Sequence, residues 1–155
     1  MLLGLAAPLP AADDVIARSS LKGVKAILVG IDPLSVDAVK AGLTEDLLRR
    51  GLEQKLRSFG IKVLEKQDPA APVYLYADIT LNHAKDAPVY VYSITLSLKQ
   101  LAYLKRDSNI QLAVPTWALT RNGVAGEKVF TAAIHRATLE LGDKFCSAYK
   151  SANGK

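Results

Sequence analysis

The segment VYLYADITLNHAKDAPVYVYSITLSL, residues 73–98, has the clearest structural pattern in the chain. Apolar side chains occupy every odd position from 73 to 81, and apolar or aromatic side chains occupy every even position from 90 to 98. Successive side chains of a β-strand point to opposite faces, so this period of two predicts two strands with one buried face each. The turn-forming run Lys85-Asp86-Ala87-Pro88 between them predicts an antiparallel hairpin.

Burial fixes the register of this hairpin. Both apolar sets must lie on one face, because a slip of one residue would bury the polar set instead. The predicted facing pairs are Leu75 with Leu98, Ala77 with Leu96, Ile79 with Ile94, and Leu81 with Tyr92. The other face then carries our candidate binding surface, made of Tyr74, Tyr76, Asp78, Thr80, Ser93, Thr95, Ser97 and Lys99. Such a face is either ordinary solvated sheet or an interface for a partner or a second copy.

A strand, a helix and a short strand are predicted before the hairpin. The β-branched, apolar run 24–31 indicates a largely buried strand. Thr44 followed by two acids is typical of a helix start, and Gly60 is typical of a helix end. Between them, four apolar side chains recur at helical spacing: Leu48, Leu52, Leu56 and Phe59. The sequence therefore predicts a helix over 44–59, followed by a short strand over 61–66.

A further strand and a helix are predicted after the hairpin. In the run 110–120 the apolar positions change parity, which predicts a β-bulge near Pro115 that lets both sets reach the core. These two sets are Ile110, Leu112 and Val114, then Trp117 and Leu119. Asn122-Gly123 indicates a turn. The last helix is predicted over 131–151, with a stripe of Ile134, Thr138, Leu141, Phe145 and Tyr149.

The order of elements predicts an α+β two-layer sandwich. One mostly antiparallel five-stranded sheet, in the order β-α-β-β-β-β-α, would carry both helices on one face. The predicted organisation is a tail over 1–12, a polar linker over 13–22, and a single domain over 23–152. A length of 155 residues with 50% hydrophobic and 23% charged residues fits one globular domain and excludes broad disorder.

The formal net charge of +5 suits an anionic partner, but the basic residues are interspersed with acids, which favours a solvated surface. No apolar run is long enough to span a membrane. Residues 1–12, MLLGLAAPLPAA, precede Asp13-Asp14 and resemble the last part of a secretory signal without its basic start. This favours export to the periplasm or the medium, and an apolar tail is the alternative. No cysteine follows the run, which disfavours a lipid anchor.

Groups that could carry chemistry are few and scattered. Cys146 lies beside the core stripe of the last helix, where a free cysteine packs as a small hydrophobe. His83 ends a predicted strand, His135 lies at the rim of a predicted helix, and Asp32 precedes a proline as turn residues do. Metal-ligand spacings and phosphate-binding glycine motifs are absent from the sequence. We therefore expect no enzyme activity, no metal and no cofactor.

Several segments resemble a family of small, uncharacterised exported bacterial α+β proteins. The resemblance rests on residues 41–48 (AGLTEDLL), 52–64 (LEQKLRSFGIKVL) and 92–98 (YSITLSL), with Thr116-Trp117 and the closing helix. It implies a fold and an exported location but no catalytic residues.

Three functions follow from these observations. The first is a non-enzymatic envelope module that binds a protein or another envelope component, with a homodimer through the sheet face or an edge also possible. The second is a cytosolic single-stranded nucleic-acid binder that uses Tyr74, Tyr76 and Lys99, although nucleic acid is disfavoured by the export signal. The third is a small hydrolase.

Overall fold

The structure is a computed structural model that describes residues 13–66 and 73–154. In this part of the chain, five strands form one sheet in the order β2-β1-β3-β4-β5. The strands are β1 (Ala26–Ile31), β2 (Lys62–Val63), β3 (Val73–His83), β4 (Val89–Leu104) and β5 (Asp107–Gly126). The helices are α1 (Val15–Ser19), α2 (Val36–Lys40), α3 (Glu45–Ser58) and α4 (Phe130–Asn153). None of these helices is long and apolar enough to cross a membrane.

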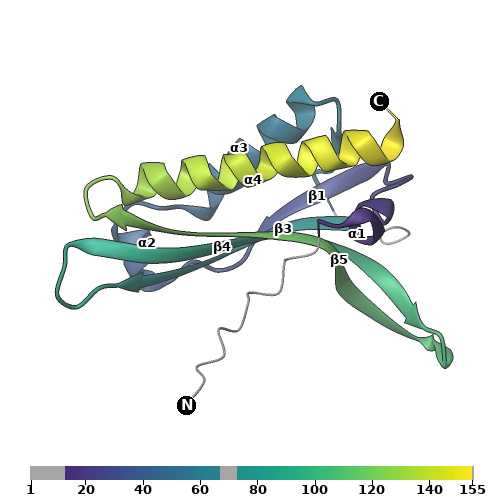
Figure 1. Ribbon diagram of the computed structural model, residues 1–155, viewed down its shortest axis with the longest axis horizontal. Helices are drawn as coiled ribbons and strands as arrows, with labels where there is room; N and C mark the ends of the chain where they lie inside the picture. Colours follow the sequence, from purple (N-terminus) through teal and green to yellow (C-terminus); the bar gives the residue numbers. More distant parts are fainter. Residues whose placement is uncertain (1–12, 67–72, 155) are drawn as a thin grey trace, which may run out of the picture.

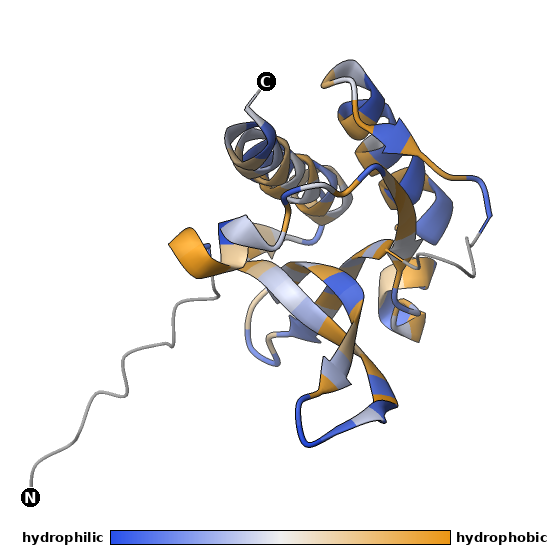
Figure 2. Ribbon diagram, turned by 90° about the vertical axis from the view of Figure 1, so that its right-hand side faces the viewer, coloured by the Kyte–Doolittle hydropathy of each residue, from blue (hydrophilic) through white to orange (hydrophobic). Residues whose placement is uncertain are grey.

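The two long helices, α3 and α4, lie on the same side of the sheet, which confirms the predicted two-layer α+β sandwich (Figures 1 and 2). The sheet is mixed, since β1 runs parallel to both β2 and β3, whereas β4 runs antiparallel to β3 and β5. The longest ladders are the antiparallel ones. In the described part of the chain, neither long helix covers the opposite face of the sheet (Figure 2).

The hairpin of β3 and β4 has the register that the alternation predicts. Leu75 faces Leu98, Ala77 faces Leu96, Ile79 faces Ile94, and Leu81 faces Tyr92. The central side chains of this set, including Ile94 and Leu96, are fully buried under the helices. Both predicted end signals of α3 are also confirmed. Thr44 Oγ1 accepts the Leu47 N–H at 3.1 Å, and Gly60 takes a φ of 75° after the last turn of α3.

The bulge in β5 lies where the parity of the sequence changes. Leu98 pairs with Trp117 and Lys99 pairs with Pro115, so Thr116 is the extra residue, and Trp117 is buried. The prediction that the first apolar set reaches the core is wrong for Ile110 and Leu112, which are exposed. The reason is that β3 pairs with β4 only as far as Gln100. Beyond it, β4 and β5 continue as a two-stranded projection, residues 101–114, here called the arm (Figure 1).

The predicted turn at Asn122-Gly123 is also wrong, because both residues lie inside β5 and pair with Ser93 and Tyr92. The Tyr92 ring lies over Gly123 so closely that any Cβ at this position would collide with it. Glycine at this position therefore allows the Tyr92 ring to pack closely, and it does not form a turn.

Residues 13–22 differ from the expected linker. They form α1 and then pack on the domain, with Ala17 and Leu21 buried. The Asp13 carboxylate accepts the Trp117 indole N–H at 2.8 Å and two N–H groups of Arg18, both at 2.8 Å. This segment is therefore tied to β5 by side-chain hydrogen bonds. The signal-like residues 1–12 lie outside the described residues.

The hairpin register can be tested by placing the same charge on each face. We expect Ile94→Lys to lower the free energy of unfolding by about 3 kcal/mol or more, because it buries an unpaired ammonium group. Thr95→Lys should lower it by no more than about 1 kcal/mol, since residue 95 lies on the open face opposite Asp78. Urea unfolding of both variants measures the difference. Equal losses would contradict the assignment of faces.

The Asp13 contact predicts a pH-dependent stability. Hydrogen bonds from Arg18 and Trp117 hold the pKa of the Asp13 carboxyl below its usual value, against partial burial, which raises it. The stabilisation is therefore present above the usual pKa of about 4 and is lost as the pH falls through the lower pKa of the folded protein. We expect Asp13→Asn to cost about 1 kcal/mol at neutral pH and less in acid, measured by urea unfolding followed through Trp117 fluorescence. A loss independent of pH would contradict this account.

Candidate functional site

The eight predicted surface residues share the uncovered face of the sheet, in four facing pairs. Tyr74 faces Lys99, Tyr76 faces Ser97, Asp78 faces Thr95, and Thr80 faces Ser93. On β5 the same rows continue into Ala118, Thr120 and Asn122. Register therefore brings the whole set together. Seven of the eight are partly or fully accessible, whereas Ser97 is buried and lies beneath the surface that a ligand would meet.

A cluster of two rings and one cation forms one end of this face. The Lys99 Nζ atom lies 4.4 Å from the centroid of the Tyr76 ring, which is the geometry of a cation–π contact. The Tyr74 and Tyr76 rings are 5.8 Å apart and tilted by 44°. The Tyr76 ring also lies against Gly30 of β1. The cluster is held on three adjacent strands and is fixed in place before any ligand binds.

Hydroxyl groups form the middle of the face. The Thr95 and Thr120 Oγ1 atoms are 2.9 Å apart and join β4 to β5. Thr80 and Ser93 occupy the next row, beside Asn122. Hydroxyl and amide groups both donate and accept hydrogen bonds, so this part of the face can meet a partner's backbone or side chains in either role.

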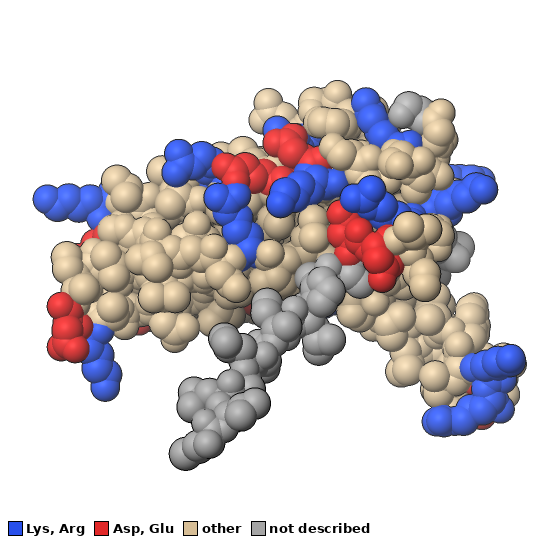
Figure 3. All heavy atoms as spheres, in the orientation of Figure 1, with Lys and Arg blue, Asp and Glu red and all other residues tan. Residues whose placement is uncertain are grey.

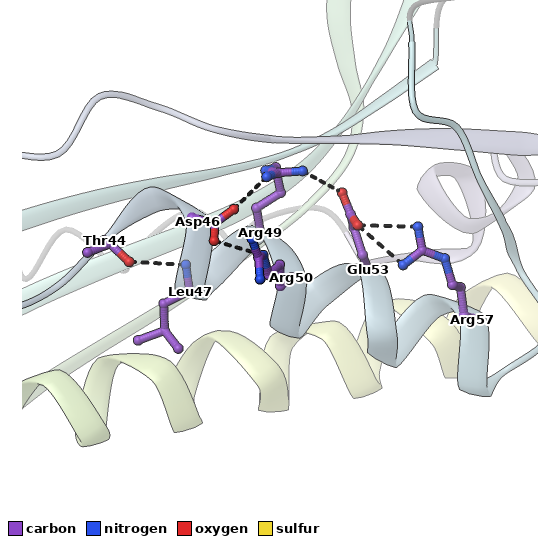
Figure 4. A network of polar contacts seen from close by, with 7 residues as sticks. All are labelled: Thr44, Asp46, Leu47, Arg49, Arg50, Glu53 and Arg57. Carbon is purple, nitrogen blue, oxygen red and sulfur yellow. Dashed lines mark hydrogen bonds and ion pairs between the residues drawn. The ribbon is translucent and has the colours of Figure 1, made fainter.

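A hollow of about 410 Å³ lies at the edge of β1, next to the two tyrosines. Tyr74 and Tyr76 line one part of it, and Arg49, Glu53 and Arg57 of α3 line another. Glu53 accepts from Arg49 at 3.1 Å and from Arg57 at 3.2 Å, and Asp46 binds Arg49 and Arg50 (Figure 4). Glu65 also lines this hollow, so the two arginines beside the rings are matched by two carboxylates.

No pattern in the sequence indicates that these arginines lie beside the tyrosines. The pattern of charges in α3 indicates only a solvated face with ion pairs at helical spacing. Their position at the hollow depends on how α3 packs at the β1 edge, which is a long-range contact. An alternation or a spacing along the chain carries no information about it.

The scattered candidates for chemistry remain on separate elements. His83 at the end of β3 is exposed and bonds to Glu127 through its Nε2 atom at 2.5 Å. His135 of α4 lines a second hollow of about 650 Å³ between α3 and α4. Asp32 donates its backbone N–H to Ala77 at the end of β1. Among the described residues, no three His, Cys, Asp or Glu side chains are grouped so as to hold a metal ion.

Cys146 is fully buried on the core side of α4, as the sequence predicts. Burial raises the pKa of its thiol to about 12, with a smaller contribution from Asp143. The thiolate, which is the reactive form, is therefore scarce at neutral pH.

This burial predicts an unreactive thiol in the folded protein. With Ellman's reagent near pH 8, we expect no measurable reaction of Cys146 on the time scale in which the unfolded chain in urea releases one equivalent of chromophore. Fast stoichiometric labelling of the native protein would contradict both the burial and the raised pKa.

No protein-family model and no curated protein matches this chain. Among solved structures, it is similar to a minor lipoprotein from Acinetobacter baumannii, with 10% identity and a TM-score of 0.45 over 82% of this chain and 93% of that one. It is also similar to a PelC dodecamer from Paraburkholderia phytofirmans, with 14% identity and a TM-score of 0.43 over 81% of this chain and 85% of that one. Both similarities are distant, so functional inference for this chain rests on its own residues.

Proposed function

We propose that this chain is an exported, non-enzymatic module of the bacterial envelope that binds a protein or another envelope component on its uncovered sheet face. The observation that carries the proposal is the arrangement of that face. Its rings, cation and hydroxyl groups stand in rows on strands whose opposite side is packed under α3 and α4.

The face has the properties of a preorganised interface. Its side chains are held by a hydrogen-bonded ladder rather than by loops, so few degrees of freedom are lost when a partner binds. Tyr74 and Tyr76 supply large amphipathic surfaces of the kind enriched in protein interfaces. The neighbouring hydroxyl rows would supply directional hydrogen bonds around these rings.

The position of the two histidines supports a binding role over a hydrolytic one. His83 is engaged with Glu127 near the hairpin loop, and His135 lines the hollow between the helices. Neither histidine is among the side chains of the sheet face, so the hydroxyl rows there have no histidine of that face as a general base. The exported location rests on the sequence of residues 1–12.

Single-stranded nucleic acid is the second candidate, favoured by one specific observation. Lys99 lies over the Tyr76 ring, and Arg49 and Arg57 line the adjoining hollow, so rings and cations stand together. Such a combination can stack bases and neutralise phosphates. The two candidates differ in salt dependence and in the compartment where the protein is found.

Site-specific photo-crosslinking in the native host tests the proposal. A benzoylphenylalanine at position 80 or 95 probes the sheet face, and the same residue at Ser147, on the exposed side of α4, is the matched control. We expect adducts of one discrete mass, in the envelope fraction, from positions 80 and 95 only. With the partner then purified, Tyr76→Ala should weaken binding about tenfold or more while the protein remains folded, as checked by circular dichroism.

Two outcomes would contradict the proposal. Adducts that form equally from Ser147 would remove the sheet face as the site. An intact cytosolic protein that binds a single-stranded oligonucleotide, with an affinity that falls steeply as salt rises and depends on Tyr76, would establish the second candidate instead.

A further inference from the structure

We infer that the arm, residues 101–114, docks on the surface of an anionic lipid bilayer. The arm is a two-stranded ribbon, because β4 has no partner other than β5 beyond Gln100 among the described residues. It projects from the sheet past the end of the helical layer (Figure 1). A ribbon of two strands is marginal in water unless its side chains pack against something. The inference is independent of the function proposed for the sheet face.

The arm exposes more large apolar side chains than is usual for a hairpin that is surrounded by water. Leu101 is 38% exposed, Tyr103 59%, Ile110 38% and Leu112 46%. In Figure 2 apolar residues continue along both strands of the arm to its hydrophilic end. Elsewhere in the described sheet, side chains of this size are mostly buried, so the arm concentrates apolar surface that remains to be covered.

The apolar side chains lie on both faces of the ribbon. Leu101 faces Ala113 and Tyr103 faces Gln111, which places them on one side. Leu112 faces Ala102 and, with Ile110, alternates to the other side. A protein partner that covers one face would leave the other in water. Immersion of the arm in the interfacial layer of a bilayer covers both faces at once, which favours lipid as the occupant.

The charges at the end of the arm fit an anionic surface. Lys105 and Arg106 form its tip, and Figure 3 shows basic side chains gathered there. The nearest acid, Asp107, accepts the backbone N–H of Asn109 at 3.0 Å. An anionic leaflet attracts lysine and arginine, and their long aliphatic stems let them reach the phosphates while neighbouring apolar groups insert.

The length of the arm fits insertion into the interfacial layer of a bilayer and is too short to span it. On the β4 side the arm comprises only residues 101–104, fewer than the roughly 9–11 residues of a membrane-spanning strand, so it can lie within the headgroup layer with Lys105 and Arg106 at the level of the phosphates. The outer edges of the ribbon carry backbone groups that need water or headgroups as partners, and both are present in this layer. Tyr103 has the amphipathic ring that is favoured at such depths.

Vesicle co-sedimentation of the full chain tests the inference. The probes are vesicles of equal parts phosphatidylethanolamine and phosphatidylglycerol, and vesicles of phosphatidylcholine alone. We expect binding to the anionic vesicles at least tenfold tighter than to the neutral ones. Tyr103→Ser with Leu112→Ser should weaken binding at least tenfold, and Lys105→Glu with Arg106→Glu should remove the preference for anionic lipid. The matched control is Val36→Ser with Val39→Ser, which removes equally exposed apolar side chains from α2 and should change nothing.

A second measurement keeps the inference testable if the serine variant folds poorly. Tyr103→Trp should show a blue-shifted emission with anionic vesicles and quenching by brominated acyl chains, whereas Val39→Trp should show neither. The inference is overturned if the wild-type chain ignores anionic vesicles, or if the arm variants bind as the α2 control does. It is also overturned if arm-dependent dimers form without lipid, since a second copy would then be the occupant.

Discussion

The alternation of buried and open side chains along β3 and β4 determines both the core and the open face of this domain. Because a strand has two faces, burying Leu75, Ala77, Ile94 and Leu96 under the helices places Tyr76, Thr80 and Thr95 on the other side. The core and the candidate binding surface are therefore set by the same register. A change that shifted the register would lose both together, since no residue can serve the two faces.

The helical layer depends on this core in turn. α3 and α4 each bury one apolar stripe, against the inner face of the sheet and against each other. Since both stripes are used on one side, the other side stays open (Figure 2). The arm arises because β4 and β5 are longer than β3 and continue where the described part of the chain supplies no third strand.

The sequence was informative wherever local chemistry decides structure. The caps of α3, the hairpin register and the bulge near Pro115 each follow from spacing or from a backbone restriction within a few residues. The errors at Ile110, Leu112 and Gly123 come from long-range facts, namely where β3 stops pairing and where the Tyr92 ring lies. The same limit applies to the site. Parity could group its eight residues on one face, but Arg49 and Arg57 join them only through the packing of α3.

The side chain of Asn153, at the end of α4, joins that helix to the segment just before β1. Its amide oxygen accepts the Gly23 N–H at 2.9 Å and its amide nitrogen donates to the Leu21 carbonyl at 3.1 Å, across sequence separations of 130 and 132 residues. The two hairpins of the sheet, in contrast, join neighbouring segments. Because the entropy lost on closing a loop grows with its length, the hairpins should form early in folding, and the hydrogen bonds of Asn153 should form last. During refolding the domain would thus acquire its sheet and its helical cover before the segment that begins at residue 13 is secured.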